Sequence, residues 1–386
     1  MGVITEVTSQ SIFGRIGNSI VGMLFGFALF FGSIILLFWN EGRAVATAKS
    51  LREGAATVID VPADNINSAN ESMLIHVTGE TAVTAALQDP IFNISEKALR
   101  LRRNIEVYVW KEKKESKSRD KIGGGKETTT TYSYEKVWSP DLIKSSSFKS
   151  ADDHRNPSRL EVPKKEFVAT NATLGQFRLT PQIIGKIESD EAMEATKDQL
   201  SQVSDDFQSK LKLDGDKFYL GDDPANPEIG DEKISFGVLR PGTLSVVAAQ
   251  TKQSFTPYVT TNEREIELVE PGNHSAAQMF AHAQAANRTL TWILRAVGFA
   301  AMFFAGLLVL GPISAMARIL PFLGSIVELG FAIVSFFLSA IVSLIVIAMA
   351  WIVYRPILGI ALIVTAIACI VMLKRLHTKR VATAPA

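Results

Sequence analysis

Charged and polar residues stand directly beside apolar runs near both ends of the chain, where their side chains could meet. A carboxylate and a guanidinium at such a boundary can form a bidentate ion pair, and Glu41 has two candidate partners, Arg295 and Arg355. We therefore expect a juxtamembrane cluster in which Glu41 pairs with one of these arginines. The residues expected in it are Asn40, Glu41, Gly42, Arg43, Arg295, Tyr354, Arg355 and Pro356. The alternative is that they are ordinary interfacial anchors and a tight turn.

Other residue types that carry chemistry do not form a recognisable site. The chain has five histidines, and none stands at a metal-ligand spacing from another His, Cys or acid; chance explains the spacing of His274 and His282. The GGGK stretch at 123–126 lacks the GxxxxGK[ST] spacing of a phosphate-binding loop, and no GxSxG nucleophile elbow is present. The sequence therefore predicts a protein that is not an enzyme, with no metal site and no cofactor.

Four apolar runs predict membrane-spanning helices: 20–39, 292–311, 327–354 and 357–373. Twenty helical residues extend about 30 Å, the thickness of a bilayer core. A cleaved export signal is the alternative for the first run. That run is longer than a signal core of about 7–15 residues, and Arg15 is the only basic residue before it. We therefore predict a permanent anchor that leaves the membrane at Asn40.

Basic residues indicate which side each segment faces. The tail 374–386 carries four basic residues and no acid, which predicts a cytoplasmic C-terminus. Four spans then place residues 1–19, a short N-terminal tail, on the same side, and residues 40–290 outside. The net charge of +1 gives no reason to expect a nucleic-acid partner.

The polar insert, 40–290, is expected to be rich in strands. Residues 99–110 alternate between apolar odd positions, broken only by Arg103, and polar or aromatic even positions, as in a strand with one buried face. Residues 130–138 alternate too, so the two runs predict a long hairpin with a solvated tip at 111–128. Further strands are expected at 73–78, 217–220, 234–239, 243–250 and 264–269, the last three as a meander.

Two helices are also expected in the insert. Apolar residues at helical spacing predict one near 188–211, and another from Ser275 should run directly into the 292–311 span. The expected fold class is thus an α+β membrane protein. Its four transmembrane helices are one N-terminal and three C-terminal (a bundle at 291–373), with the large β-rich extramembrane domain between the first and the second.

Small residues repeat along two of the predicted spans. Gly22 and Gly26 form a GxxxG pair in the first, and Ser335, Ser339 and Ser343 share one face of the third. Such residues allow helices to approach closely, so we interpret them as packing positions. The alternative is a polar seam that lines a path or grips a lipid headgroup.

Many short motifs together resemble one family. They are NEGRA, HVTGE, DPIF, LRLRRNIEVYVW, YSYEKVW, GDKFYLGDDPANPEIGDEKISF, LTWILRAVG and YRP, in this order between Val21 and Pro356. This set resembles the transmembrane protein 43 family, also called LUMA. The resemblance implies one N-terminal span, a large luminal domain and three C-terminal spans. It also implies homo-oligomers and, in eukaryotic members of the inner nuclear membrane and endoplasmic reticulum, contacts with lamins and emerin.

The chain departs from the family at a short N-terminus and a divergent segment at 111–128. The short N-terminus, without a nuclear-targeting basic run, favours a bacterial homologue in the inner membrane with a periplasmic or extracellular domain. In a eukaryote the location would be the endoplasmic reticulum or nuclear envelope.

We expect a non-enzymatic integral membrane scaffold that self-associates through its helices. Its outer domain would be presented to membrane lipids or other membrane proteins. The alternative is a channel or lipid-handling protein that uses the Ser335, Ser339 and Ser343 face.

Overall fold

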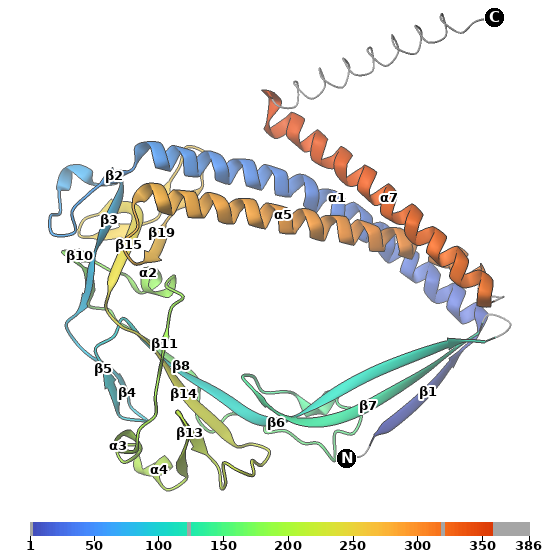
Figure 1. Cartoon of the computed structure of the whole chain (residues 1–386), viewed down its shortest axis with the longest axis horizontal. Helices are drawn as coiled ribbons and strands as arrows, with labels where there is room; N and C mark the ends of the chain where they lie inside the picture. The colour runs from blue at the N-terminus through green and yellow to red at the C-terminus, as the bar shows by residue number, and fades with distance from the viewer. Residues whose placement is uncertain (1–2, 122–124, 318–320, 358–386) are drawn as a thin grey trace, which may run out of the picture. The chain divides into compact units, whose positions relative to one another are not determined.

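The computed structural model describes residues 3–121, 125–317 and 321–357 (Figure 1). Within these limits the chain divides into two compact units. The sheet-rich unit comprises Met1–Val7, Arg52–Lys117 and Thr129–His282, and the helical unit comprises Thr8–Leu51, Ser118–Thr128 and Ala283–Ala386.

Long helices dominate the helical unit. The α-helices among the described residues of both units are α1 (Ile12–Thr57), α2 (Pro181–Gly185), α3 (Lys197–Leu200), α4 (Asp205–Gln208), α5 (Ala276–Val309), α6 (Gly311–Ala317) and α7 (Pro321–Tyr354). Among the described residues, three helices are long and apolar enough to cross a membrane, in α1, α5 and α7. They correspond to the first three predicted spans, although α5 ends at Val309, before the predicted end at residue 311. The description ends at Ile357. The fourth predicted span, 357–373, beyond its first residue, and the basic tail, 374–386, therefore lie outside the described residues.

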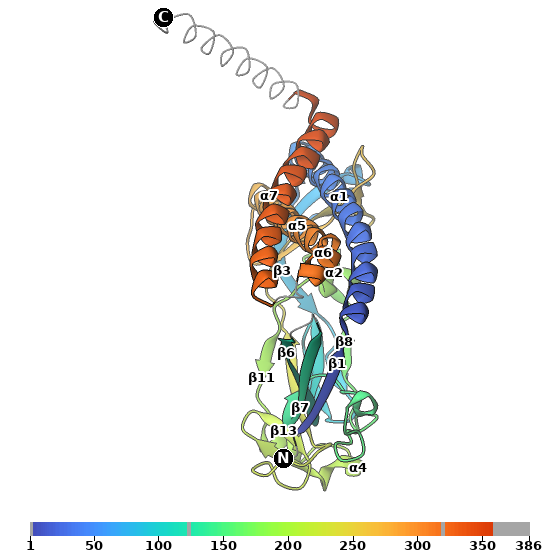
Figure 2. The same cartoon turned by 90° about the vertical axis from the view of Figure 1, so that its right-hand side faces the viewer.

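The helices α1 and α5 are longer than the apolar runs that they contain. Helix α1 continues beyond Asn40 to Thr57 through helix-forming Ala, Lys and Leu residues, and the exit from the membrane at Asn40 stays a prediction. The prediction that a helix from Ser275 runs into the next span is confirmed, since α5 extends unbroken from Ala276 to Val309. Figure 2 shows α5 between α1 and α7.

Eight strands form the first sheet, in the order β1-β7-β6-β14-β13-β12, with β11 on β14 and β8 on β6. The prediction of a long hairpin is confirmed by β6 and β7, although both strands run further into the polar tip than expected. The bounds are β1 (Ile4–Gln10), β6 (Arg100–Asp120), β7 (Lys126–Ser139), β8 (Lys165–Val168), β11 (Glu191–Met193), β12 (Leu211–Asp214), β13 (Lys217–Leu220) and β14 (Glu232–Leu239).

The N-terminal residues are not a free tail. Strand β1 pairs with β7 of the insert, and the Glu6 carboxylate lies 2.9 Å from Lys149 Nζ. The hydrogen bond and the charge of Lys149 lower the pKa of the Glu6 carboxyl. Part of the expected N-terminal tail is therefore a strand of the first sheet, while the side of the membrane on which it lies stays a prediction.

The second sheet has seven strands in the order β19-β15-β16-β10-β9-β3-β2, and β15 also pairs with β3. Its strands are β2 (Ile59–Asp60), β3 (Leu74–Val83), β9 (Ala172–Leu174), β10 (Phe177–Arg178), β15 (Thr243–Thr251), β16 (Ser254–Thr256) and β19 (Leu268–Pro271). The two remaining pairs are β4 (Leu87–Asp89) with β5 (Ile94–Glu96), and β17 (Tyr258–Val259) with β18 (Glu265–Ile266). The expected meander is wrong, because β14 and β15 belong to different sheets.

The helix predicted near 188–211 is replaced by β11, α3, α4 and β12. Its apolar residues do face one core, where Met193, Leu200, Val203 and Leu211 pack beside β13 and β14. A capping box at Thr196 starts a new short helix there. The spacing of apolar residues in 188–211 therefore predicted which side chains are buried, but it did not predict the backbone conformation.

A buried ion pair stabilises the core of the first sheet. Arg103 Nη1 lies 2.7 Å from both carboxylate oxygens of Asp89, and burial lowers the pKa of Arg103. Asp89 Oδ1 also accepts the backbone N–H groups of Ile91 and Phe92 at 2.9 and 3.2 Å. Arg103, which interrupts the apolar face of its strand, is thus satisfied inside the core.

Candidate functional site

A fully buried carboxylate joins the three long helices of the helical unit. Arg295 of α5 donates from Nε to Glu41 Oε1 at 2.6 Å and from Nη2 to Oε2 at 2.9 Å. Trp351 of α7 donates from Nε1 to Glu41 Oε2 at 2.8 Å. A bidentate guanidinium with a third donor can offset much of the cost of burying a charge. Glu41 therefore connects α1 to both neighbours.

The same turn of α1 also forms a hydrogen-bonded network with α5. Asn40 Nδ2 donates to the Thr291 carbonyl at 3.1 Å. Arg43 donates to Asn287 Oδ1 at 3.0 Å, to Thr291 Oγ1 at 3.0 Å and to Asn40 Oδ1 at 3.2 Å. Residues 287, 291 and 295 follow at intervals of four, so they share one face of α5.

At Gly42, a residue of α7 packs directly against the backbone of α1. A Cβ atom at this position would lie 2.6 Å from Cζ of Tyr354, so the tyrosine ring occupies the space that a larger residue would need. The Tyr354 ring also contacts Phe38, with centroids 5.4 Å apart. Glycine thus allows this contact sterically.

The structure brings most of the expected cluster together. Glu41 pairs with Arg295, whereas Arg355 lies over the Trp351 ring, 5.8 Å from its centroid. Pro356 is exposed and takes no part in these contacts. Sequence reasoning missed Asn287, Thr291 and Trp351. The four-residue spacing of the first two with Arg295 was the available signal.

The predicted packing residues lie between helices of the same chain. A Cβ on Gly26 would come within 2.9 Å of Leu308 Cβ and 3.0 Å of the Ala305 carbonyl oxygen, while one on Gly22 would lie 3.7 Å from Leu308. These glycines therefore face α5.

The serine face of α7 packs on α5 as well. Ser335, Ser339 and Ser343 are buried, with Ser335 against Gly306 and Ser343 Oγ 3.6 Å from Met302 Sδ.

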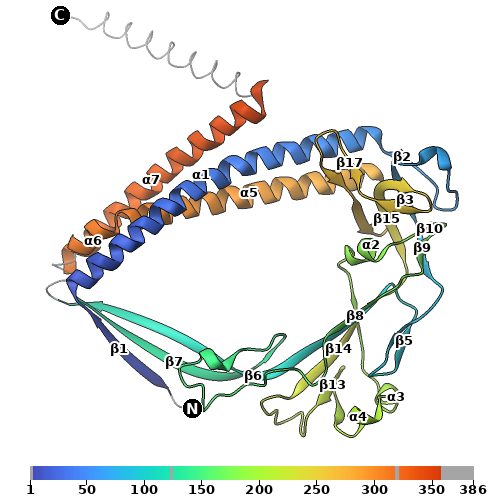
Figure 3. The same ribbon diagram turned by 180° about the vertical axis from the view of Figure 1, so that it is seen from behind.

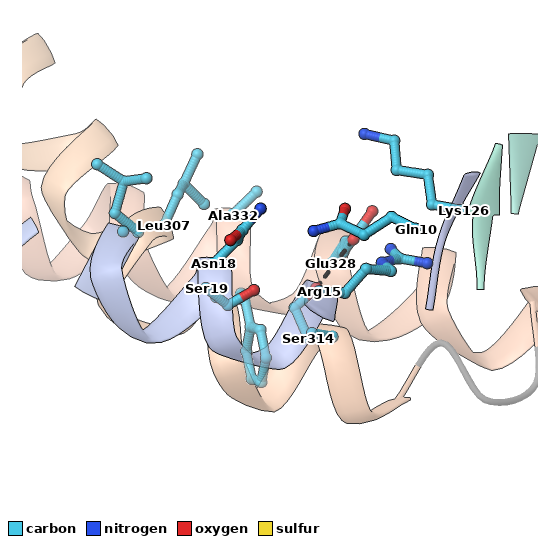
Figure 4. Close-up of a pocket in the computed structure, with 14 residues that line it drawn as sticks. Gln10, Arg15, Asn18, Ser19, Lys126, Leu307, Ser314, Glu328 and Ala332 are labelled. Atoms are coloured by element: carbon cyan, nitrogen blue, oxygen red, sulfur yellow. Dashed lines mark hydrogen bonds between the residues drawn. The ribbon is translucent and has the colours of Figure 1, made fainter. Parts of the chain in front are cut away.

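A pocket of about 610 Å³ lies at the other end of the helices, where α1 begins. Figure 4 shows Gln10, Arg15, Lys126 and Glu328 at one end of it. Arg15 is 8% exposed and donates to Asp120 at 2.9 Å, and Ser314 donates to Glu328 at 2.9 Å. The rest of the wall includes Gly22 and the apolar side chains of Leu307, Leu308 and Phe331. The pocket thus runs from charged to apolar.

Metal-ligating residues do not converge in the part of the chain that the structure describes. Within it, no three His, Cys, Asp or Glu side chains form a group that could hold a metal ion. The rings of His274 and His282 are 5.8 Å apart, and His282 pairs with Glu270.

Apolar helices tied by a buried ion pair, together with a large sheet-rich unit, define an integral membrane protein with a polar domain. The family model "Transmembrane protein 43" matches residues 107–356. The chain is 31% identical to "Transmembrane protein 43" of Mus musculus over 92% of this chain and 89% of the relative. The identity is 31% to the Homo sapiens protein, over 90% of each chain. It is 28% to the Drosophila melanogaster homolog, over 88% and 90%.

The chain therefore belongs to the transmembrane protein 43 family, as its motifs indicated. No solved structure matches it.

Proposed function

We propose that the chain is a non-enzymatic membrane scaffold, in which membrane helices carry a sheet-rich unit that is presented to partners. The observation that supports this most directly is the continuity of α1 and α5, each of which contributes residues to both units without a break. Such helices transmit force between the parts that they join. The Glu41–Arg295–Trp351 contacts would keep α1, α5 and α7 together as one body.

Self-association is part of this proposal. The Gly26 face is occupied by α5, so another surface must join the copies. Several large apolar residues of α7 are half or more exposed, and among them Ile333, Phe337, Ile341 and Leu344 recur at helical spacing. We propose that they contact a second copy, with membrane lipids and other membrane proteins as further partners. The membrane would be a bacterial inner membrane, or the endoplasmic reticulum or nuclear envelope in a eukaryote.

The native mass in mild detergent or nanodiscs tests this proposal. We expect a multiple of the 42.1 kDa chain, reduced towards the monomer by Phe337→Ala combined with Ile341→Ala. The matched control is Phe27→Ala with Phe31→Ala, which removes exposed rings of α1 and should leave the mass unchanged. A monomer at every concentration of the unmodified protein would reject self-association.

Lipid handling is the second candidate, and the pocket beside Arg15 favours it. Lys126 and Arg15 could bind a lipid phosphate, Glu328 a headgroup ammonium, and the Leu307 wall the first acyl carbons. This predicts that a phospholipid co-purifies and that Lys126→Ala lowers its amount, measured by mass spectrometry. Lys117→Ala is the control, because this exposed lysine does not line the pocket. Equal lipid in both variants would remove this support.

The other form of this alternative uses the serine face of α7 as a path for ions or lipids. It predicts flux through reconstituted vesicles that is lost in Ser339→Leu. A scaffold predicts no flux from the unmodified protein, so this measurement separates the two functions.

A further inference from the structure

Basic residues outnumber acids at the end of the helical unit where Glu41 lies. The segments of this unit contain four acids in all: Glu41, Asp120, Glu127 and Glu328. Two of them belong to the hairpin segment, and Glu328 stands near the start of α7. The basic residues that follow the apolar part of α1, precede that of α5 or follow α7 are Arg43, Lys49, Arg288, Arg295 and Arg355. Within this unit, Glu41 is the acid that stands beside them.

The guanidinium of Arg355 has a ring contact but no acid to neutralise it. The Glu41 carboxylate already accepts hydrogen bonds from Arg295 and Trp351. Arg355 lies over the Trp351 ring, 5.8 Å from its centroid, and its backbone N–H donates to the Trp351 carbonyl at 2.7 Å. Among the described residues, no carboxylate forms an ion pair with Arg355. Its half-buried charge therefore calls for an anion from outside the chain.

Exposed tryptophans place this charge at the depth of the lipid headgroups. Helices α1 and α5 run side by side (Figures 1 and 3). Trp39 of α1 and Trp292 of α5 each stand within one turn of the buried ion pair, and they are 55% and 67% exposed. Exposed indoles gather where hydrocarbon meets water. Arg295 lies over Trp292 at 4.7 Å and over Trp351 at 5.8 Å, and Arg355 shares the second ring, so it belongs to this layer.

Exposed apolar residues of α7 continue from Arg355 towards the middle of the helix. Ile352, Ala348 and Ile345 stand three, seven and ten residues before Arg355, so they lie on the same side of the helix. All three are exposed. A guanidinium can bind a phosphate through two parallel hydrogen bonds, and an exposed apolar strip suits an acyl chain. The order from charge to apolar surface is that of a phospholipid.

We propose that Arg355 and this strip of α7 bind an anionic phospholipid, with the phosphate on the guanidinium and an acyl chain along Ile352. The site rests on the proposed function, because it specifies the class of lipid among the partners of the scaffold. A zwitterionic lipid would bring an ammonium group that needs a carboxylate. The carboxylate of Glu41 is fully buried and paired with Arg295, so the charge of the site selects the anionic lipid.

The lipid that stays with the purified protein tests this site. The protein is reconstituted into vesicles of equal parts phosphatidylglycerol and phosphatidylcholine and extracted in mild detergent, and the retained lipids are measured by mass spectrometry. We expect an excess of phosphatidylglycerol. Arg355→Gln should lower the ratio about fivefold, the usual effect of one basic residue at an anionic membrane surface. Arg355→Lys should keep part of the excess, because lysine retains the charge without the planar fork.

Lys49→Gln is the matched control for the loss of one charge. Lys49 is exposed and stands ten residues beyond Trp39, about 15 Å further along the helix, so the ratio should not change. An equal loss in this control, or equal amounts of the two lipids on the unmodified protein, would overturn the site. The native mass judges the scaffold separately. A monomer that retains phosphatidylglycerol would reject self-association alone, and an oligomer without lipid preference would reject the site alone.

Discussion

Two buried carboxylates, Glu41 in the helical unit and Asp89 in the sheet-rich unit, are each fully shielded from solvent and each paired with an arginine. Their other partners differ. Asp89 accepts backbone N–H groups from Ile91 and Phe92, two and three residues further along the chain. Glu41 takes its further hydrogen bond from Trp351, 310 residues away.

The difference separates two uses of the same chemistry. Asp89 is partly satisfied by its own turn, so its ion pair completes a structure that is already local. Glu41 depends on α5 and α7 for the partners described above, and burial without them would leave a bare charge. The first pair stabilises one core, and the second holds three helices together.

Removing each arginine tests this comparison with the largest expected effect. Arg295→Met and Arg103→Met should each lower the free energy of unfolding by about 3–5 kcal/mol, because a buried charge loses its partner. Hydrogen exchange should locate the loss in α1, α5 and α7 for the first variant and in the first sheet for the second. The double variant Glu41→Leu/Arg295→Met should recover much of the loss. Equal loosening of both units by either variant would contradict the comparison.

Substitution of Gly26 tests how tightly α1 and α5 pack near the other end of the pair. Gly26→Ala should destabilise the helical unit by about 1–3 kcal/mol, because its Cβ would press on the Ala305 carbonyl and Leu308. Gly32→Ala is the matched control. No atom lies within 4 Å of its added Cβ, so the better helix propensity of alanine should stabilise α1 by up to about 1 kcal/mol. Thermal unfolding in detergent measures both, and equal effects would argue against the packing.

Trp351, the third hydrogen-bond donor to the Glu41 carboxylate, can be replaced by phenylalanine, which keeps an aromatic ring but has no N–H group. Trp351→Phe should cost about 1–3 kcal/mol, the usual effect of leaving a buried acceptor short of a donor. Trp292→Phe is the control, since Trp292 lies over the Arg295 guanidinium at 4.7 Å but is exposed. A larger loss in the control would show that ring contacts, not the N–H group, stabilise the cluster.

A pH titration gives the smallest effect and concerns a third buried carboxylate, Glu232. Burial raises its pKa, although the N–H groups of Val162 and Glu161 partly oppose this. The folded state therefore holds a proton that the unfolded state has already lost. Stability should fall as the pH rises from the ordinary Glu pKa through the raised value, and Glu232→Gln should flatten this slope. An unchanged slope would show that Glu232 does not titrate in this range.

Much of the candidate site could be predicted from the sequence, but the full set of residues that form it could not. Glu41 and the two arginines stand out because charges beside apolar runs are costly. The choice between Arg295 and Arg355 depends on which helix faces α1, and no local pattern contains that information. Trp351 escaped notice because an aromatic residue near the end of an apolar run is ordinary, and only its indole N–H direction distinguishes it.

By itself, the sequence determined the apolar helices, the alternating strands of the long hairpin and the family, since these follow from local periodicity and residue order. Tertiary structure decided that residues 4–10 join a sheet, that 188–211 breaks into strands and short helices, and that Gly26 faces its own chain. The physical reason is that these outcomes depend on partners far along the chain. A segment such as β1 forms a strand only when a partner such as β7 supplies the hydrogen-bonding groups of a sheet. The carboxylate of Glu41 likewise has its place set by an arginine 254 residues away.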